Sequence, residues 1–481
     1  MKKVINKYTI GCLSLALVLG SCSKSFITKS PQTSLLTSQA LGDSSALQAA
    51  LNGAYNELGV VDVYGRDLPV VGDLMADNTY VQIKNSNRYI SQYNYSVTAE
   101  DAIPFDVWSA CYTAILRVNQ VIDAITTGSF SGTTINQIES QALAIRALMY
   151  FKLVNYFATT YTADSSKLGV PLVLHYAPFA LPTRSSIGTV YNQIVSDLKT
   201  AIPLAPPYVN SVTLNQYAEE ALLARVYLYT GDYTDAESTA QDVINNSGFS
   251  LVSAANLVSF WANPAIHTDQ VEVMFEINQD VLENNGFDDL GGIYVNGYAD
   301  LYCSNQLDSL YFLHDTTDAR AQLILSGATA TGVPAWVVNK YPNAGNSDRD
   351  NPKVIRLAEV YLIGAESAAR NGDANTAKTW LNALMAKRDT TFPGYTDAGQ
   401  ALINDVVLER RKELAFEGDR FFDLNRLGLS IFRSPNAGAL PAGPGNVNLV
   451  IPYPDNRRVA PIPNAEIQAN PNIASQQNPG Y

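Results

Sequence analysis

The chain has 481 residues, a net charge of −13 and only 16% charged residues. This length can bury a large core and can contain more than one domain, and the acidic balance argues against a nucleic-acid partner. The three histidines lie far apart, without metal-ligand spacing, so neither a metal site nor a cofactor is expected. The sequence also lacks the HExxH, P-loop, GxSxG and CxxC motifs.

The first residues are typical of a targeting segment. A lysine-rich start precedes the apolar stretch 10–20, which is shorter than the roughly 20 residues needed to cross a bilayer and suits a signal peptide. The stretch ends in Leu-Gly-Ser-Cys, which resembles the lipobox of bacterial lipoproteins. We therefore expect a signal peptide over 1–21, lipidation of Cys22 (palmitate among the chains) and a polar tether over 22–38. A plain secretory signal is the alternative.

Helical periodicity dominates the body of the chain. Apolar residues recur at helical spacing over 46–58, 105–125, 135–157, 214–245 and 354–388. The last two segments are typical of helix–turn–helix units, and small residues such as Ala224, Gly231 and Ala236 hold the offsets of a tetratricopeptide repeat. Because the two units are far apart, we expect non-tandem helix pairs. Ordinary helical hairpins are the alternative.

Two loops rich in tyrosine and amides, 80–95 and 288–302, interrupt the helices. The second lies within the stretch 249–345, where helical periodicity fades and a strand is predicted over 271–277. Aromatic rings beside amides and carboxylates suit the apolar faces and hydroxyl edges of sugars. The candidate ligand-binding residues are Tyr80, Asn85, Arg88, Tyr89, Tyr93, Asp288, Tyr294, Tyr298, Trp336 and Tyr341.

Each of these tyrosines could instead belong to the core, which is where we place Trp108, Trp380 and the thiol of Cys111. Acidic pairs in the loops could be catalytic or calcium ligands, but we interpret them as solvated loop charge. These pairs are Asp288 with Asp289 and Asp348 with Asp350.

The segment 402–428 combines an apolar helix face with a dense run of charges, interrupted by Gly418. Its carboxylates could be general acids, as in glycosidases. The neighbouring arginines, however, lower a carboxyl pKa, whereas a general acid needs a raised one. We therefore predict a structural ion network and assign no catalytic residue.

The sequence ERRKELAFEGDRFFDLNR (409–426) resembles the signature segment of the SusD/RagB family, nutrient-binding lipoproteins of the Bacteroidetes outer membrane. Two further stretches resemble the family: a long helix leading into GVPLVL (169–174), and a C-terminal stretch, 460–472, similar to PIPxxEIxxNP. The resemblance implies a mostly α-helical, SusD-like fold with non-tandem helix pairs and long loop-rich insertions. It divides the mature chain into an N-terminal helical region, 39–248, and a C-terminal region, 249–481.

The resemblance also implies a function. The protein would be a lipid-anchored protein of the cell outer membrane, exposed at the surface. It would capture an oligosaccharide and deliver it to a TonB-dependent (SusC-like) transporter, with no chemistry on the ligand. Surface exposure rests on the family alone, because residues 22–25 lack the acidic run that resembles a surface-export signal.

The alternatives are a peptide-binding member of the same family, a surface glycoside hydrolase using Asp288 or Asp289, and an intracellular repeat scaffold. The signal segment argues against the last.

Overall fold

The computed structural model describes residues 41–313, 317–440 and 449–481. The predicted signal peptide, Cys22 and the tether lie outside the described residues. Helices predominate in the described residues, with short strands between them, as the sequence predicted.

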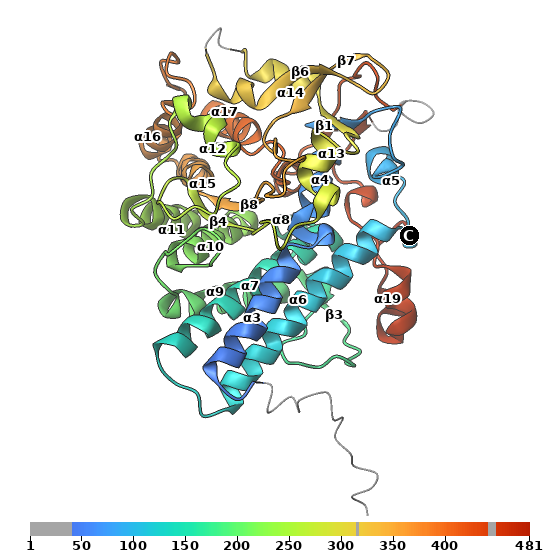
Figure 1. Cartoon of the computed structure of the whole chain (residues 1–481), viewed down its shortest axis with the longest axis vertical. Helices are drawn as coiled ribbons and strands as arrows, with labels where there is room; N and C mark the ends of the chain where they lie inside the picture. The colour runs from blue at the N-terminus through green and yellow to red at the C-terminus, as the bar shows by residue number, and fades with distance from the viewer. Residues whose placement is uncertain (1–40, 314–316, 441–448) are drawn as a thin grey trace, which may run out of the picture.

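The longer helices pack side by side in one array (Figure 1). They are α3 (Ser44–Leu58), α6 (Ala102–Thr127), α7 (Thr133–Phe157), α9 (Ile187–Ala201), α10 (Gln216–Thr230), α11 (Tyr233–Asn246), α15 (Leu357–Asn371), α16 (Ala374–Met385) and α17 (Gly399–Glu413). Each packs on the next in this order as far as α16, and α17 packs on α15. The predicted helices are therefore confirmed, with boundaries that differ by a few residues.

The two predicted helix hairpins, α10–α11 and α15–α16, have the same turn. Gly231 and Gly372 end the first helix of each pair in the left-handed region, at φ 77° and 89°, which glycine adopts without a Cβ penalty. The next residue, Asp232 or Asp373, then caps the second helix with its side chain. Helix α11 packs on α15, so the hairpins adjoin in space. Their assignment as tetratricopeptide units stays a prediction.

Short strands hold the loop-rich parts together. Antiparallel β1 (Thr79–Val81), β5 (Leu301–Cys303), β7 (Pro334–Val338) and β6 (Ile324–Ala328) form one sheet in that order. Two-stranded sheets pair β2 (Leu168–Pro171) with β3 (Arg184–Ser186), β4 (Val273–Glu276) with β8 (Lys353–Arg356), and β9 (Ile431–Phe432) with β10 (Val450–Ile451). The strand predicted over 271–277 is β4.

Shorter helices complete the chain: α4 (Asp67–Leu74), α5 (Ile90–Asn94), α8 (Tyr161–Asp164), α12 (Leu257–Trp261), α13 (Leu290–Tyr294), α14 (Asn305–Leu310), α18 (Arg420–Arg426) and α19 (Asn464–Ala469). The stretch 249–345 is thus more structured than its lack of periodicity suggested. It builds a second hydrophobic core beside that of the helical array, and it lies in the upper part of Figure 1. Trp108, Trp380 and the free thiol of Cys111 are buried, as predicted.

A buried ion network surrounds the segment 409–426, which confirms the structural interpretation. Glu413 accepts hydrogen bonds from Arg356 (3.0 Å), Arg388 (2.9 Å) and Arg320 (3.3 Å), and all four side chains are buried. Burial alone would raise the pKa of Glu413, but these arginines hold it well below its usual value. A carboxylate held this way is a structural anion.

Asp419 departs from the expectation that the neighbouring arginines lower its pKa. Burial raises the pKa of Asp419, whose nearest cation is Lys152 at 3.8 Å. The turn before it is tight, because Gly418 has φ 90° and a Cβ there would lie 2.4 Å from the Cα of Pro69. The signature turn therefore packs directly on α4.

Candidate functional site

Pairing of β1 with β5 brings the two tyrosine-rich loops together. Tyr80 lies opposite Tyr302 in this pair, and their rings stack with centroids 6.0 Å apart. The guanidinium of Arg88, from the first loop, lies 3.6 Å from the ring centroid of Tyr298, from the second. The sequence predicted the composition of these loops, and the structure adds that they form one surface.

The half-exposed carboxylate of Asp288 connects this surface to the start of α4. It accepts a hydrogen bond from Nη1 of Arg66 at 2.8 Å and lies 3.4 Å from Nη2 of Arg88. We call Arg66, Arg88, Asp288 and Tyr298 the loop cluster. Because the Arg88 guanidinium lies over the Tyr298 ring, it holds the ring in place and puts polar groups beside it.

Five of the predicted ligand residues are buried and belong to the core, which corrects their assignment as ligand contacts. Tyr80, Tyr89, Tyr93, Tyr294 and Tyr341 are each at most 5% exposed. Packing of their rings inside the second hydrophobic core explains the burial. The Tyr341 hydroxyl, for example, donates to the carbonyl of Phe416, and its ring stacks on that of Tyr294.

The other candidates lie nearer the surface. Trp336 is partly buried in β7, opposite Cys303, and Asn85 is partly buried with its amide donating to the carbonyl of Gln82. The interpretation of the acidic pairs as solvated charge was wrong for two of the four residues. Asp289 is buried and caps α13, and Asp350 is buried and accepts two hydrogen bonds from Asn343.

A cavity of about 520 Å³ lies beside the loop cluster. Its charged lining residues are Asp62, Arg66, Asp67, Arg88, Asp101 and Asp106. Burial, together with the negative charges of Asp62 and Asp67, raises the pKa of Asp106 to about 6. Acids outnumber arginines here, so the cavity favours hydroxyl groups or cations over anions.

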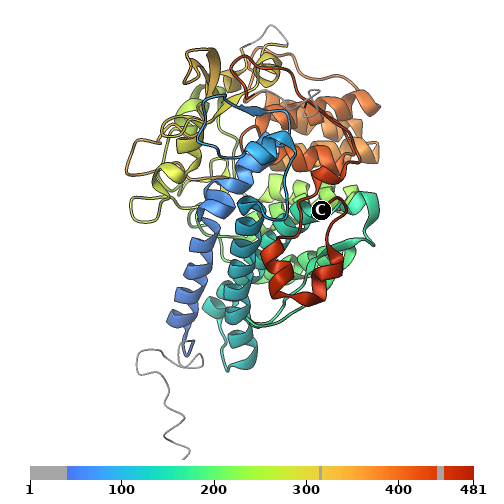
Figure 2. The same cartoon turned by 90° about the vertical axis from the view of Figure 1, so that its right-hand side faces the viewer.

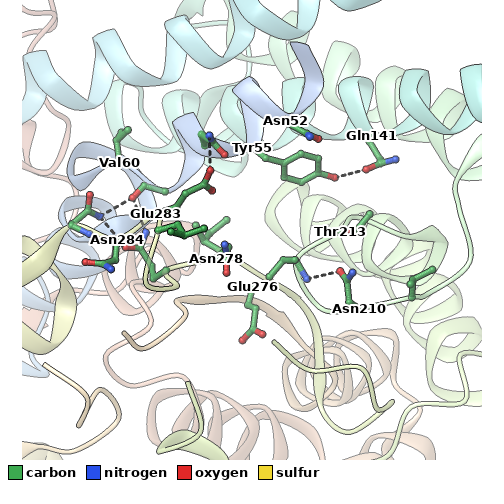
Figure 3. A pocket seen from close by; sticks show the side chains of 18 of the residues that line it. Asn52, Tyr55, Val60, Gln141, Asn210, Thr213, Glu276, Asn278, Glu283 and Asn284 are labelled. Carbon is green, nitrogen blue, oxygen red and sulfur yellow. Dashed lines mark hydrogen bonds between the residues drawn. The ribbon is translucent and has the colours of Figure 1, made fainter. Parts of the chain in front are cut away.

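A larger cavity, of about 730 Å³, lies between α3, the segment 209–213 and the loop 276–285 (Figure 3). We call it the amide pocket, because asparagine and glutamine dominate its lining. These residues are Gln48, Asn52, Asn56, Gln141, Asn210, Asn278, Gln279, Asn284 and Asn285. An amide side chain both donates and accepts hydrogen bonds, and so does a sugar hydroxyl.

Hydrogen bonds hold the walls of the amide pocket in place. The Tyr55 hydroxyl donates to Gln141 at 2.8 Å, as Figure 3 shows. The carbonyl of Gly59, at the end of α3, accepts from the amides of Gln279 (2.9 Å) and Asn285 (2.8 Å). Among the described lining residues the carboxylates are Glu276, which pairs with Lys353, and Glu283, which keeps its charge and accepts a hydrogen bond from the amide of Asn56. The pocket is therefore preformed and close to neutral.

The amide pocket and the loop cluster adjoin. Asn285 lines the pocket and Asp288 belongs to the cluster, and three residues of chain span at most about 11 Å. The amide pocket and Arg66 were not predicted, because α3 lies more than 200 positions from the loop 276–285 in the sequence, and so does Arg66 from Asp288. The one local signal was the run of amides over 278–285.

In the described parts of the chain, no three His, Cys, Asp or Glu side chains are placed to hold a metal ion. No helix within 41–313, 317–440 or 449–481 is both long and apolar enough to cross a bilayer.

Comparison with known proteins identifies the family. Residues 26–228 match a family model described as "Starch-binding associating with outer membrane", and residues 300–481 match one described as "SusD family". A crystal structure of a SusD superfamily protein from Bacteroides thetaiotaomicron superposes with a TM-score of 0.83 at 31% identity, over 91% of this chain and 99% of its own. The chain belongs to the SusD/RagB family.

Two further family members cover nearly the whole chain. A SusD-like protein of Formosa agariphila is 26% identical over 99% of this chain and 100% of its own length. A laminarin binding SusD-like protein has a TM-score of 0.71 at 22% identity, over 91% of this chain and 99% of its own, and that likeness shows the fold alone. The family predicted from the signature segment is confirmed.

Proposed function

We propose that the protein captures an oligosaccharide on the surface formed by the loop cluster and the amide pocket, and releases it unaltered. The observation that carries this proposal is the amide pocket: a preformed cavity of about 730 Å³, close to neutral, lined by amides and by Tyr55. Neutral sugars offer many hydroxyl groups and no charge, so amides can bind them without burying an unpaired ion.

The loop cluster complements the pocket. Sugar rings have apolar CH faces, which pack on aromatic rings. The Tyr298 ring is partly exposed and is fixed by Arg88, so it loses little conformational freedom when a ligand binds. The family relatives support the same ligand class, since one family model is described as starch-binding and one structural neighbour as laminarin binding.

Delivery to a partner extends the proposal. We infer that the protein is lipid-anchored through Cys22 to the outer membrane and passes its ligand to a SusC-like, TonB-dependent transporter. The lipobox-like sequence and the family support this inference. Labelling with radioactive palmitate should mark the wild-type protein and not Cys22→Ala, and an equally labelled variant would refute the anchor. Affinity purification of the tagged protein from its own outer membrane should recover a TonB-dependent transporter, and recovery without one would refute the delivery step.

The site supports binding rather than hydrolysis. Asp288 is paired with two arginines, and Asp289 is buried, caps α13 and lies 3.6 Å from Arg349, so neither is free to protonate a ligand. In the cavity beside the loop cluster, the pKa of Asp106 is raised to about 6, which makes it the acid to test. Product release by the wild-type protein that disappears in Asp106→Asn would establish a hydrolase in place of a binder.

Variants at the surface map the proposed site. The first pair is Tyr298→Ala and Arg88→Ala in the loop cluster, and the second is the double change Asn52→Ala with Asn56→Ala in the pocket. Each should weaken glycan binding by about tenfold or more, which corresponds to roughly 1.4 kcal/mol, without changing the unfolding temperature. Tyr233→Ala is the matched control, since Tyr233 is also partly exposed with an arginine over its ring, at 5.1 Å, but lies on α11. Equal losses in Tyr233→Ala and Tyr298→Ala would refute this placement of the site.

A further inference from the structure

A separate cavity of about 410 Å³ lies under the C-terminal segment, and its lining shares no residue with the loop cluster or the amide pocket. It is bounded by the end of α7, by β2 and β3, and by the chain around 453–459 and 477–479. Figure 2 shows the C-terminal segment packed along the side of the helical array. The side chains that line this cavity include two buried arginines.

Two arginines line this cavity while nearly fully buried, Arg184 at 5% and Arg458 at 3% exposure. Among the described residues neither forms an ion pair with a carboxylate; Arg184 donates only to backbone carbonyls and to no acid. Burial lowers the pKa of Arg184 to about 10, and burial also lowers that of Arg458. Buried charges are normally paired, because an unpaired ion in a low-dielectric site is costly.

Arg458 has a donor to spare. Its Nε donates to Asn425 at 2.8 Å, and its Nη1 donates to the carbonyls of Leu429 and Pro452. Its Nη2 is buried and has no hydrogen-bond partner in the described structure. Arg458, a residue that lines the cavity, thus keeps one buried amino group without a hydrogen-bond partner in the described structure.

The rest of the lining leaves the cavity positive. Lys167 adds a third, exposed cation, whose ammonium lies 3.8 Å from exposed Asp164. The carboxylate in the lining, Asp455, forms its ion pair with Arg457, at 2.9 Å, and attracts Arg458 only from a longer distance. In the ion network the opposite holds: buried Arg426, for example, pairs with both Glu366 and Asp423. A net positive cavity is thus an exception in a chain of net charge −13.

We propose that this cavity, the arginine pocket, binds a small ligand that carries an oxyanion: a carboxylate, sulfate or phosphate on a compact body. The Nη2 amino group of Arg458 can donate charge-assisted hydrogen bonds to such a group, and the anion supplies the counter-charge that the fold leaves out. The Tyr453 ring and the side chains of Leu168 and Pro454 line the same cavity and would contact the body of the ligand. The pocket is independent of the proposed glycan surface.

The test uses the chain from residue 23 onward with three probes: sodium phosphate, sodium sulfate and sodium glucuronate. Each is titrated by calorimetry at constant ionic strength held with sodium chloride, so that general screening does not change. We expect saturable binding of at least one probe. Glucuronate binding more tightly than both inorganic ions indicates an acidic sugar as the natural class, and the reverse order indicates a free inorganic ion.

Two variants make the result specific. Arg458→Gln should lose binding by about tenfold or more, the loss expected for one charge-assisted hydrogen bond, and Lys167→Gln should lose it by a smaller factor. Lys167 is 68% exposed, so this variant tests the pocket even if Arg458→Gln does not fold. The matched control is Lys387→Gln, an exposed lysine outside the cavity lining. The proposal is overturned if no probe binds beyond chloride, or if Lys167→Gln and Lys387→Gln bind alike.

Discussion

The buried ion network predicts that Glu413→Gln destabilises the protein strongly. Both carboxylate oxygens of Glu413 accept hydrogen bonds from arginines, and the side chain is 3% exposed. Glutamine keeps the shape but removes the charge, which leaves Arg320, Arg356 and Arg388 short of one counter-charge. Removing one partner of a buried ion pair costs about 3–5 kcal/mol.

The three arginines keep other acidic partners, so the expected loss in the free energy of unfolding lies near the lower end of this range. Glu272 still pairs with Arg356 (2.8 Å) and Arg388 (2.7 Å), and Arg320 keeps Asp318 and Glu409. We therefore expect Glu413→Gln to lower the free energy of unfolding by about 3 kcal/mol at pH 7. Equilibrium unfolding in urea, followed by circular dichroism, measures this loss, with the slope m as a check on two-state behaviour.

The same variant has a defined pH dependence. Because the folded-state pKa of Glu413 lies well below its unfolded value, its contribution is present above about pH 4.5 and is lost as the pH falls further. The difference in the free energy of unfolding between wild type and Glu413→Gln should therefore shrink below about pH 4. Glu283→Gln is the control, since exposed Glu283 has one amide partner and should change stability by less than about 0.5 kcal/mol. A loss below about 1 kcal/mol for Glu413→Gln at pH 7, or a gap that stays constant to pH 3, would refute the reasoning.

Two further predictions concern the turn and the core. Gly418→Ala should lower the free energy of unfolding by at least about 2 kcal/mol, because φ at this position is positive and the new Cβ would meet the Pro69 backbone. Gly372 has a similar φ but open space around it, so Gly372→Ala should lower the free energy of unfolding by about 1 kcal/mol. Similar losses in thermal unfolding of the two variants would contradict the close packing. Burial raises the pKa of Glu219 to about 8, although the hydrogen bond from Ser140 lowers it. Between pH 5 and 8 the folded state therefore binds a proton that the unfolded state releases, and the free energy of unfolding of the wild type should fall as the pH rises through this range. Glu219→Gln should abolish that fall, and a variant with the wild-type pH profile would show that another group titrates.

The sequence predicted the ion network and pairs between near neighbours in the segment, but not the distant partners of Glu413. Spacing along a helix shows only near neighbours, such as Arg426 with Asp423, three residues apart. The partners of Glu413 come instead from β8, from the end of the second hairpin and from the stretch 249–345. Asp419 was misjudged for the same reason, since its environment is made by Lys152 on α7. Long-range packing decides which acid meets which base.

The candidate site was predicted in part. The two loops that carry Arg88 and Tyr298 were identified from their composition, and the β1–β5 pairing joins them. Composition could not separate Tyr298, which is partly exposed, from Tyr294, which is fully buried four residues earlier. The amide pocket was missed because α3 and the loop 276–285 meet only in the folded chain.

The most direct test of the account measures ligand capture itself. The chain lacking residues 1–22 is run in affinity electrophoresis against neutral polysaccharides and peptides, and each ligand that retards it is titrated by calorimetry, with products analysed by chromatography. We predict retardation by at least one neutral glycan, with saturable binding, no released product and a loss of affinity in Tyr298→Ala. Binding of a peptide and no glycan, or cleavage of the retarding glycan, would contradict the proposed function.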